Sequence, residues 1–116
     1  MTTSVRRTAA DVLTAWRGGV VVSCQAPDGS PLRQPAIMAA MAQAADMAGA
    51  VGIRANGPAD VAAIRAVTEL PIVGIDKRPD VDPVIYITPT LKSVAALVEA
   101  GADLVAIDAT LRPRNG

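Results

Sequence analysis

Histidine and phenylalanine are absent from this sequence of 116 residues, and it has one cysteine and two aromatic side chains, Trp16 and Tyr86. Without histidine, Ser-His-Asp and Cys-His mechanisms are excluded, and a transition-metal site would have very few ligands. The single cysteine, Cys24, cannot form an internal disulfide, and its place at the end of an apolar run favours core packing. We therefore predict no metal site and no cysteine nucleophile.

Strong net charge and long apolar runs are also lacking. Eleven basic residues balance eleven acidic ones, which gives no support for nucleic acid or an anionic membrane as a partner. Two aromatic residues cannot build a base-stacking platform. No run approaches the length of a membrane span, and no apolar stretch typical of a signal peptide follows Arg6 and Arg7. We expect a cytoplasmic protein that binds neither nucleic acid nor membranes.

What the sequence does contain is a series of short apolar runs separated by helical patterns. The expected strands are 20–24, 50–53, 71–75 and 103–107. The expected helices are 4–17, 35–48, 58–68 and 90–100. Three prolines between residues 78 and 90 predict a long loop, with a strand-like piece at 84–87. The alternation of strands and helices predicts an α/β fold with parallel strands.

One leading helix, four parallel strands and three connecting helices make half of a (β/α)8 TIM barrel. A complete barrel takes about 250 residues, so we predict a single N-terminal half-barrel, 1–116, with the C-terminal half of the barrel absent. An open doubly wound sheet is the alternative, but no Gly-rich phosphate fingerprint follows the first strand. The last strand would leave an open edge, so we expect a homo-oligomer or association with a separate C-terminal half.

Helical spacing also predicts which residues face the core. In the second helix these are Ile37, Met41, Ala44, Ala45 and Ala48. In the last helix they are Leu91, Val94, Ala95 and Val98.

Four polar residues follow the apolar runs: Gln25, Arg54, Lys77 and Asp108. The carboxyl ends of parallel strands lie on one face of the sheet, so we predict that these side chains converge there. A neutral lysine is a competent general base or Schiff-base nucleophile. A guanidinium suits a carboxylate or a phosphate, and an amide can both donate and accept. The carboxylate of Asp108 can orient Lys77 or accept a sugar hydroxyl.

Each of these four residues also has a purely structural interpretation. Lys77 can be a solvated surface lysine, and Arg54 can pair with Asp108 or Asp76 at the rim of the sheet. Gln25 can cap a loop, and Asp108 can cap a following helix. The case for a site therefore rests on the four positions together and on no single residue.

Six motifs in succession resemble the signatures of the N-acetylmannosamine-6-phosphate 2-epimerase family. They are Ser23-Cys-Gln25, Ala36-Ile-Met38, Gly52-Ile-Arg-Ala-Asn-Gly57, Gly74-Ile75 with Lys77-Arg78, Tyr86-Ile-Thr-Pro-Thr90, and Ala106-Ile-Asp-Ala-Thr110 with Arg112. The resemblance implies a barrel of the phosphate-binding type. It also implies an isomerase that interconverts N-acetylmannosamine 6-phosphate and N-acetylglucosamine 6-phosphate in sialic acid and N-acetylmannosamine catabolism, without a cofactor.

By the same resemblance Lys77 is the catalytic acid/base, and Gln25 and Arg54 contact the substrate. Asp108 is a substrate-binding candidate by position. The chain departs from the family in having Asp76 directly before Lys77, where an apolar residue is usual. In a strand Asp76 should point away from Lys77. The resemblance places a second acid/base, a glutamate, and the phosphate-binding loops in the second half of the barrel, outside this sequence.

Two other functions remain open at this point. In the first, the chain is a catalytically inactive half-barrel that self-associates or needs a separate C-terminal half. In the second, it belongs to another phosphosugar barrel, a lyase or aldolase in which Lys77 forms a Schiff base.

Overall fold

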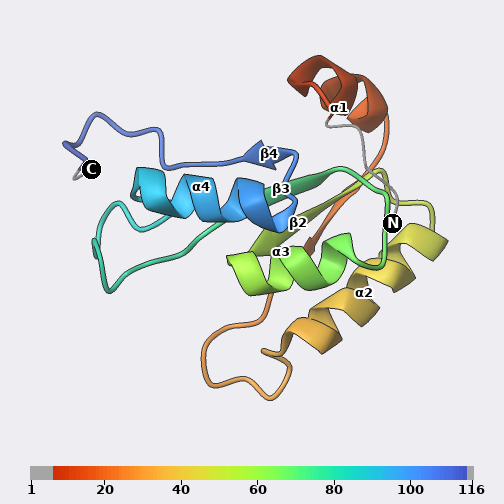
Figure 1. Cartoon of the computed structure of the whole chain (residues 1–116), viewed down its shortest axis with the longest axis horizontal. Helices are drawn as coiled ribbons and strands as arrows, with labels where there is room; N and C mark the ends of the chain where they lie inside the picture. Colours follow the sequence, from red (N-terminus) through yellow and green to blue (C-terminus); the bar gives the residue numbers. More distant parts are fainter. Residues whose placement is uncertain (1–6, 115–116) are drawn as a thin grey trace.

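The computed structural model describes residues 7–114 and consists of alternating helices and strands (Figure 1). In chain order the elements are α1 (Ala9–Trp16), β1 (Val21–Cys24), α2 (Pro35–Met47), β2 (Gly52–Asn56), α3 (Pro58–Arg65), β3 (Ile72–Ile75), α4 (Leu91–Ala100) and β4 (Leu104–Val105). The predicted alternation of a leading helix, four strands and three connecting helices is confirmed.

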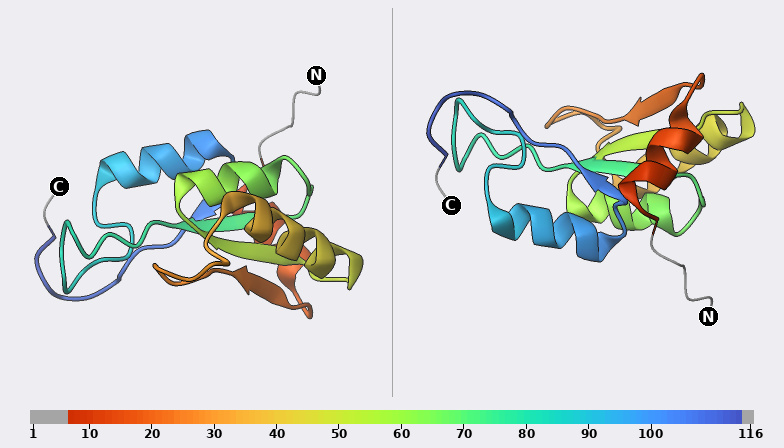
Figure 2. Two further views of the ribbon diagram at one scale, coloured as in Figure 1. Left: turned by 90° about the horizontal axis from the view of Figure 1, so that it is seen from below. Right: turned by 90° about the horizontal axis from the view of Figure 1, so that it is seen from above.

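The four strands form one parallel sheet in the order β1-β2-β3-β4. Helices α2, α3 and α4 cover one face of this sheet, and α1 lies on the opposite side, near the amino ends of the strands (Figures 1 and 2). This is the arrangement of half of a β/α barrel, in which helices surround the outside of a curved sheet. The sheet therefore has an outer face, covered by helices, and an inner face.

The strand register assigns side chains to these two faces. Ser23 pairs with Arg54 in one row, and Cys24 pairs with Ala55 in the next. Cys24 and Ala55 are fully buried in the core beneath the helices, whereas Ser23 is exposed and Arg54 is half-buried. Because side chains alternate along a strand, Ser23 and Arg54 belong to the inner face.

The core fills the space between the sheet and its three covering helices. Its fully buried members are aliphatic or small: Cys24, Ala42, Ile53, Ala55, Val61, Ile64, Ile72 and Leu97. Burying one such aliphatic side chain contributes about 1.5–3 kcal/mol, more than an exposed ion pair provides. Burial also raises the pKa of the Cys24 thiol. The predicted packing role of Cys24 is confirmed.

The predicted core faces of two helices are only partly correct: Ile37 and Ala45 of α2 pack against the core as predicted, but the most buried positions differ. In α2 the buried residues are Met38, Ala39 and Ala42, while Met41 is 38% exposed. In α4 Ser93 and Leu97 are buried, and Leu91 is 76% exposed. Alanine and other apolar residues occupy most positions around the circumference of α2 and α4. The sequence pattern therefore predicts the helical period, but it does not distinguish the buried face of each helix from the exposed face.

The predicted ends of two strands also need correction. Strand β2 begins at Gly52 and extends to Asn56, so Arg54 lies in the middle of the strand and does not follow its end. Residue 50 still belongs to the exit from α2, because Gly49 has φ 94° and the Ala50 N–H donates to the Ala45 carbonyl. Strand β4 is limited to two residues, and Ile107 beyond it is 51% exposed.

Two further boundaries differ from the sequence prediction, and the long loop is confirmed. Thr8 caps α1 with a reciprocal capping box to Asp11, so the helix starts at Ala9. The start expected at residue 4 lies outside the described residues. The segment 76–90 is a long loop whose single bridge, between Lys77 and Ile87, is antiparallel. Helix α3 ends at Arg65 and not at Thr68.

Helix α1 closes the amino end of the inner face through Trp16. The indole lies against Gly52, where a Cβ atom would come within 2.2 Å of the indole Nε1. A glycine is therefore required at this point of β2 for the ring to approach the strand. The buried Trp16 N–H has no hydrogen-bond partner among residues 7–114.

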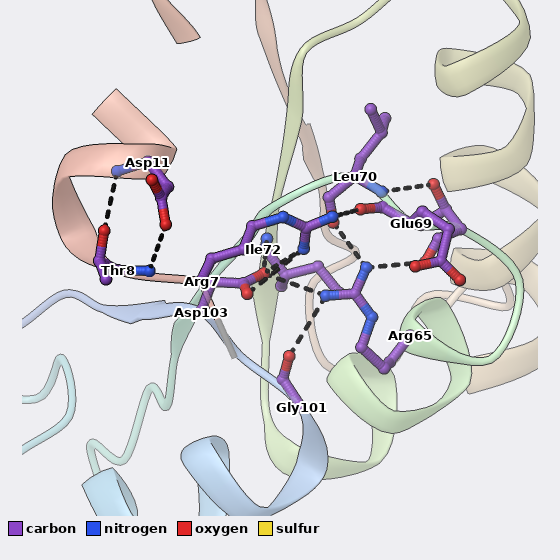
Figure 3. A network of polar contacts seen from close by, with 10 residues as sticks. Arg7, Thr8, Asp11, Arg65, Glu69, Leu70, Ile72, Gly101 and Asp103 are labelled. Atoms are coloured by element: carbon purple, nitrogen blue, oxygen red, sulfur yellow. Dashed lines mark hydrogen bonds and ion pairs between the residues drawn. The ribbon is translucent and has the colours of Figure 1, made fainter. Parts of the chain in front are cut away.

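A polar network around Asp103 joins four segments at the amino edge of the sheet (Figure 3). The Asp103 carboxylate, 8% exposed, accepts from Arg65 at 3.0 Å and from the Ile72 N–H at 2.9 Å. Arg65 also donates to the carbonyls of Thr68 and Leu70, each at 2.7 Å. Arg7 approaches the same carboxylate at 3.4 Å and donates to the Glu69 carbonyl.

We expect Asp103→Ala to lower the free energy of unfolding by roughly 2–3 kcal/mol. The substitution leaves the Ile72 N–H without its acceptor and the Arg65 guanidinium without its carboxylate partner in a largely buried place. The matched control is Asp80→Ala, which removes an exposed carboxylate paired with Arg78 and should change stability by less than about 1 kcal/mol. Urea unfolding of both variants measures the difference, and equal effects would contradict the role given to Asp103.

Candidate active site

A cavity of about 490 Å³ opens at the carboxyl edge of the sheet. The loops that follow β1 and β3 and the last residue of β2 form its wall. This is the edge where β/α barrels build their sites. The lining residues are Gln25, Ala26, Pro27, Asp28, Arg33, Asn56, Lys77, Pro79, Pro83 and Tyr86. Two of the four predicted site residues, Gln25 and Lys77, therefore lie in the same cavity.

Gln25 reaches the cavity from the end of β1. Its Nε2 donates to the Ser23 Oγ at 2.8 Å, which places both side chains on the inner face. Because that bond uses the amide nitrogen, the Oε1 of Gln25 is the atom left to accept a hydrogen bond from a ligand.

Lys77 is exposed in the cavity, and its neighbours in sequence point elsewhere. The carboxylate of Asp76 is buried and accepts from the Ser93 hydroxyl of α4 at 2.8 Å. Asp76 therefore faces the helices, and the predicted separation of Asp76 from Lys77 is confirmed. Arg78 pairs with Asp80 at 2.7 Å, and the hydrogen bonds to Asp80 raise the pKa of the Arg78 guanidinium.

Asn56 is a cavity residue that the sequence analysis did not identify as a site candidate. It is the last residue of β2 and is only 7% exposed. Its Oδ1 accepts from the backbone N–H of Lys77 at 2.9 Å. An asparagine at the end of a strand and before a helix is the signal that could have identified it, since that position opens on the site of a β/α fold.

A second missed group is the ion pair between Arg33 and Asp28, in the loop that follows β1. The two side chains meet at 2.9 Å, and Arg33 also donates to the Ala26 carbonyl at 3.0 Å. The Arg33 guanidinium is a second basic group on the cavity wall, in addition to Lys77. Turn-forming residues dominate this loop, and they gave no indication that Arg33 would fold back towards the strand end.

Arg54 and Asp108 do not line the cavity. Arg54 lies on the inner face two residues closer to the amino edge than Asn56, and it makes no side-chain hydrogen bond or ion pair within the described part of the chain. Asp108 is engaged elsewhere, because its Oδ2 accepts from the Ile87 N–H at 3.1 Å. The structure thus brings together Gln25 and Lys77, with Arg54 below them and Asp108 at the base of the loop 76–90.

The loop 76–90 is held in place by Thr88, which has φ 49° and is 1% exposed. A β-branched residue rarely adopts this conformation. Its hydroxyl donates to the Ala106 carbonyl at 2.7 Å and accepts from the Asp76 N–H at 3.1 Å. These bonds anchor the returning half of the loop between β3 and β4, and the loop carries Tyr86 to the cavity.

Two absences apply to residues 7–114. No group of three or more histidine, cysteine, aspartate or glutamate side chains is arranged there to hold a metal ion. None of the helices in that range is long and apolar enough to cross a membrane.

The parallel sheet, the helices on its outer face and the cavity formed by successive βα loops define a protein of the β/α-barrel class. The profile of one family, described as "Putative N-acetylmannosamine-6-phosphate epimerase", matches residues 38–116. The chain belongs to this N-acetylmannosamine-6-phosphate epimerase family, and the resemblance found in its sequence motifs is confirmed.

Individual relatives agree with this assignment. A protein from Caldanaerobacter subterraneus subsp. tengcongensis is 49% identical over 91% of this chain, and one from Synechococcus elongatus is 54% identical over 84% of it. Both carry the name "Putative N-acetylmannosamine-6-phosphate 2-epimerase". The solved structure of the N-acetylmannosamine-6-phosphate 2-epimerase from Clostridium perfringens superposes with a TM-score of 0.85 at 43% identity, covering 97% of this chain.

The match covers only part of each relative. The chain spans 45% and 43% of the two curated relatives and 49% of the Clostridium perfringens structure. The half-barrel architecture described above agrees with this coverage.

Proposed function

We propose that this chain supplies the N-terminal half of the active site of an N-acetylmannosamine-6-phosphate 2-epimerase, with Lys77 as its acid/base. The observation that carries the proposal is the position of Lys77. It is exposed in the cavity at the carboxyl edge of the sheet, beside Gln25 and Asn56. The substrate would be an amino-sugar phosphate, and the reaction would serve N-acetylmannosamine and sialic acid catabolism in the cytoplasm.

The chemistry requires a base next to the sugar C2. In the open-chain form, C2 adjoins the C1 aldehyde, so the C2–H bond breaks when neutral Lys77 Nζ takes the proton and the electron pair moves to O1 as an enolate. Returning a proton to the opposite face of C2 gives the epimer. A cation or N–H donor near O1 stabilises the enolate. No step requires histidine, a metal ion or an organic cofactor.

The surroundings of Lys77 support this role. The Asp76 carboxylate is bonded to Ser93 on the helix side, and Asp80 is paired with Arg78. Neither carboxylate is therefore available to hold the ammonium of Lys77. The only anion on the cavity wall among the described residues, Asp28, is paired with Arg33.

Gln25 and Arg54 are proposed as substrate contacts, and Asp108 takes a different role from the one expected. The free Oε1 of Gln25 can accept from a sugar hydroxyl or from the acetamido N–H. Arg54, which lies below the cavity without a carboxylate partner in the described part of the chain, can approach the substrate from the inner face. Since the Asp108 carboxylate holds the Ile87 N–H, we propose that it positions the loop 76–90 and does not orient Lys77.

The decisive test is the appearance of solvent deuterium at C2 of N-acetylmannosamine 6-phosphate. The chain is assayed alone and together with the C-terminal half of the Caldanaerobacter subterraneus relative. Lys77→Ala should lower the exchange rate at least about a hundredfold, because general acid/base catalysis contributes 10²–10⁴-fold. Lys92→Ala is the matched control: Lys92 is the chain's other lysine, lies exposed on α4, and should leave the rate unchanged.

The outcomes separate the competing functions. Exchange that survives Lys77→Ala would contradict the role of Lys77. Exchange in neither preparation would favour a catalytically inactive half-barrel. Borohydride treatment in the presence of substrate tests the lyase or aldolase alternative, since a trapped adduct on Lys77 requires an imine that epimerisation does not form.

Association is proposed separately, from the open edges of the sheet. Strands β1 and β4 form its two edges, and β4 is only two residues long. Unpaired strand edges favour pairing with another chain. We expect sedimentation to show the chain as a dimer or higher oligomer, or bound to a separate C-terminal half. A stable monomer for the chain alone, together with no binding to a separate C-terminal half, would contradict this expectation.

A further inference from the structure

The backbone ladder between β2 and β3 stops one hydrogen bond short of Lys77. The Gly57 N–H donates to the Ile75 carbonyl at 2.7 Å, which is the last bond of the ladder. Gly57 then turns with φ 93° to cap α3, and its carbonyl accepts from the Val61 N–H at 3.0 Å. In a parallel ladder that carbonyl would otherwise accept from Lys77. The start of α3 therefore removes the natural acceptor for the Lys77 N–H.

The side chain of Asn56 replaces the missing carbonyl. Its Oδ1 accepts from the Lys77 N–H at 2.9 Å, and the side chain is 7% exposed. Because a backbone N–H is the donor, the oxygen of the amide must face Lys77, which directs the Nδ2 group the other way. This Nδ2 donates to no residue in the range 7–114, and Asn56 lies on the cavity wall.

We propose that Asn56 is a two-ended positioning residue: Oδ1 holds Lys77 at the strand end, and Nδ2 donates a hydrogen bond to an oxygen of the bound sugar. The ligand class is a sugar phosphate with a hydroxyl or carbonyl oxygen beside the reacting carbon, so the second half of the inference rests on the proposed function. Asn56 thus supplies a donor where Gln25 supplies an acceptor. A hydroxyl, or the N–H and carbonyl of an acetamido group, satisfies both.

Substitution by aspartate separates the acceptor role of the Asn56 Oδ1 from the donor role of its Nδ2. A carboxylate keeps the acceptor for the Lys77 N–H and loses the donor, whereas Asn56→Ala loses both. Gln43→Glu is the matched control, because it makes the same change of charge at an exposed position of α2, away from the cavity. All variants are made in the 116-residue chain, with near-native circular dichroism as the criterion for folding.

The first measurement is hydrogen exchange of the Lys77 amide, followed by NMR without ligand. Asn56→Ala should speed exchange about tenfold, the effect of losing one protecting hydrogen bond. Asn56→Asp and Gln43→Glu should keep the rate close to that of the unsubstituted chain. Unchanged exchange in Asn56→Ala would overturn the positioning role.

The second measurement is titration with N-acetylmannosamine 6-phosphate. Asn56→Ala and Asn56→Asp should both raise the dissociation constant by about three- to tenfold or more, and Gln43→Glu should not. Binding by Asn56→Asp that equals the unsubstituted chain would overturn the donor role. If the unsubstituted chain binds no ligand, the donor role fails together with the proposed function. In that case the amide measurement still decides the positioning role, because it needs no ligand.

Discussion

The carboxylate of Asp103 fixes β4 to β3, and the rest of the site depends on that attachment. Strand β4 has only two residues, so the ladder alone offers it few hydrogen bonds. Asp103 adds a bond to the Ile72 N–H and an ion pair with Arg65, whose other donors bind the turn after α3. Position and register of β4 are therefore set from the amino edge of the sheet.

The attachment of β4 through Asp103 also affects the carboxyl edge of the sheet. Just beyond β4, the Ala106 carbonyl accepts from the Thr88 hydroxyl, and the Asp108 carboxylate accepts from the Ile87 N–H. These two contacts hold the returning half of the loop 76–90, and that loop brings Tyr86 to the cavity. The molecule thus separates its tasks along the strands. Charged groups at the amino edge stabilise the sheet, and polar groups at the carboxyl edge remain available for chemistry.

Most of the fold follows from local patterns in the sequence. Four apolar runs, separated by segments of helical spacing, permit few arrangements other than parallel strands with helical connections. The exact limits of β2 and β4 could not be predicted, since they depend on contacts distant in sequence. The glycine-capped exit of α2 means that β2 begins only at Gly52. Beyond the end of β4, the Asp108 N–H donates to the Ile87 carbonyl, and the Asp108 carboxylate accepts from the Ile87 N–H. The alanine-rich α2 likewise gave no contrast to show that Met38, rather than Met41, is buried.

The candidate site was less accessible to sequence reasoning. Lys77 and Gln25 could be predicted, because each lies within two residues of the end of an apolar run and strand ends meet at one edge. The apolar run at 50–53 predicts a strand that ends just before Arg54, whereas the structure extends β2 to Asn56. The role of Asn56 could not be predicted, because it depends on the backbone N–H of Lys77, beyond the end of the neighbouring strand β3. Such a relationship exists only in three dimensions.

The central claim is that the cavity beside Lys77 receives an amino-sugar phosphate. Mapping amide chemical-shift changes over the whole chain during addition of N-acetylmannosamine 6-phosphate tests it most directly. The account predicts saturable changes concentrated at Gln25, Asn56 and Lys77, with little change around Asp103 at the opposite edge of the sheet. Saturable changes centred on the helices or on the amino edge, or no change at any residue, would contradict it.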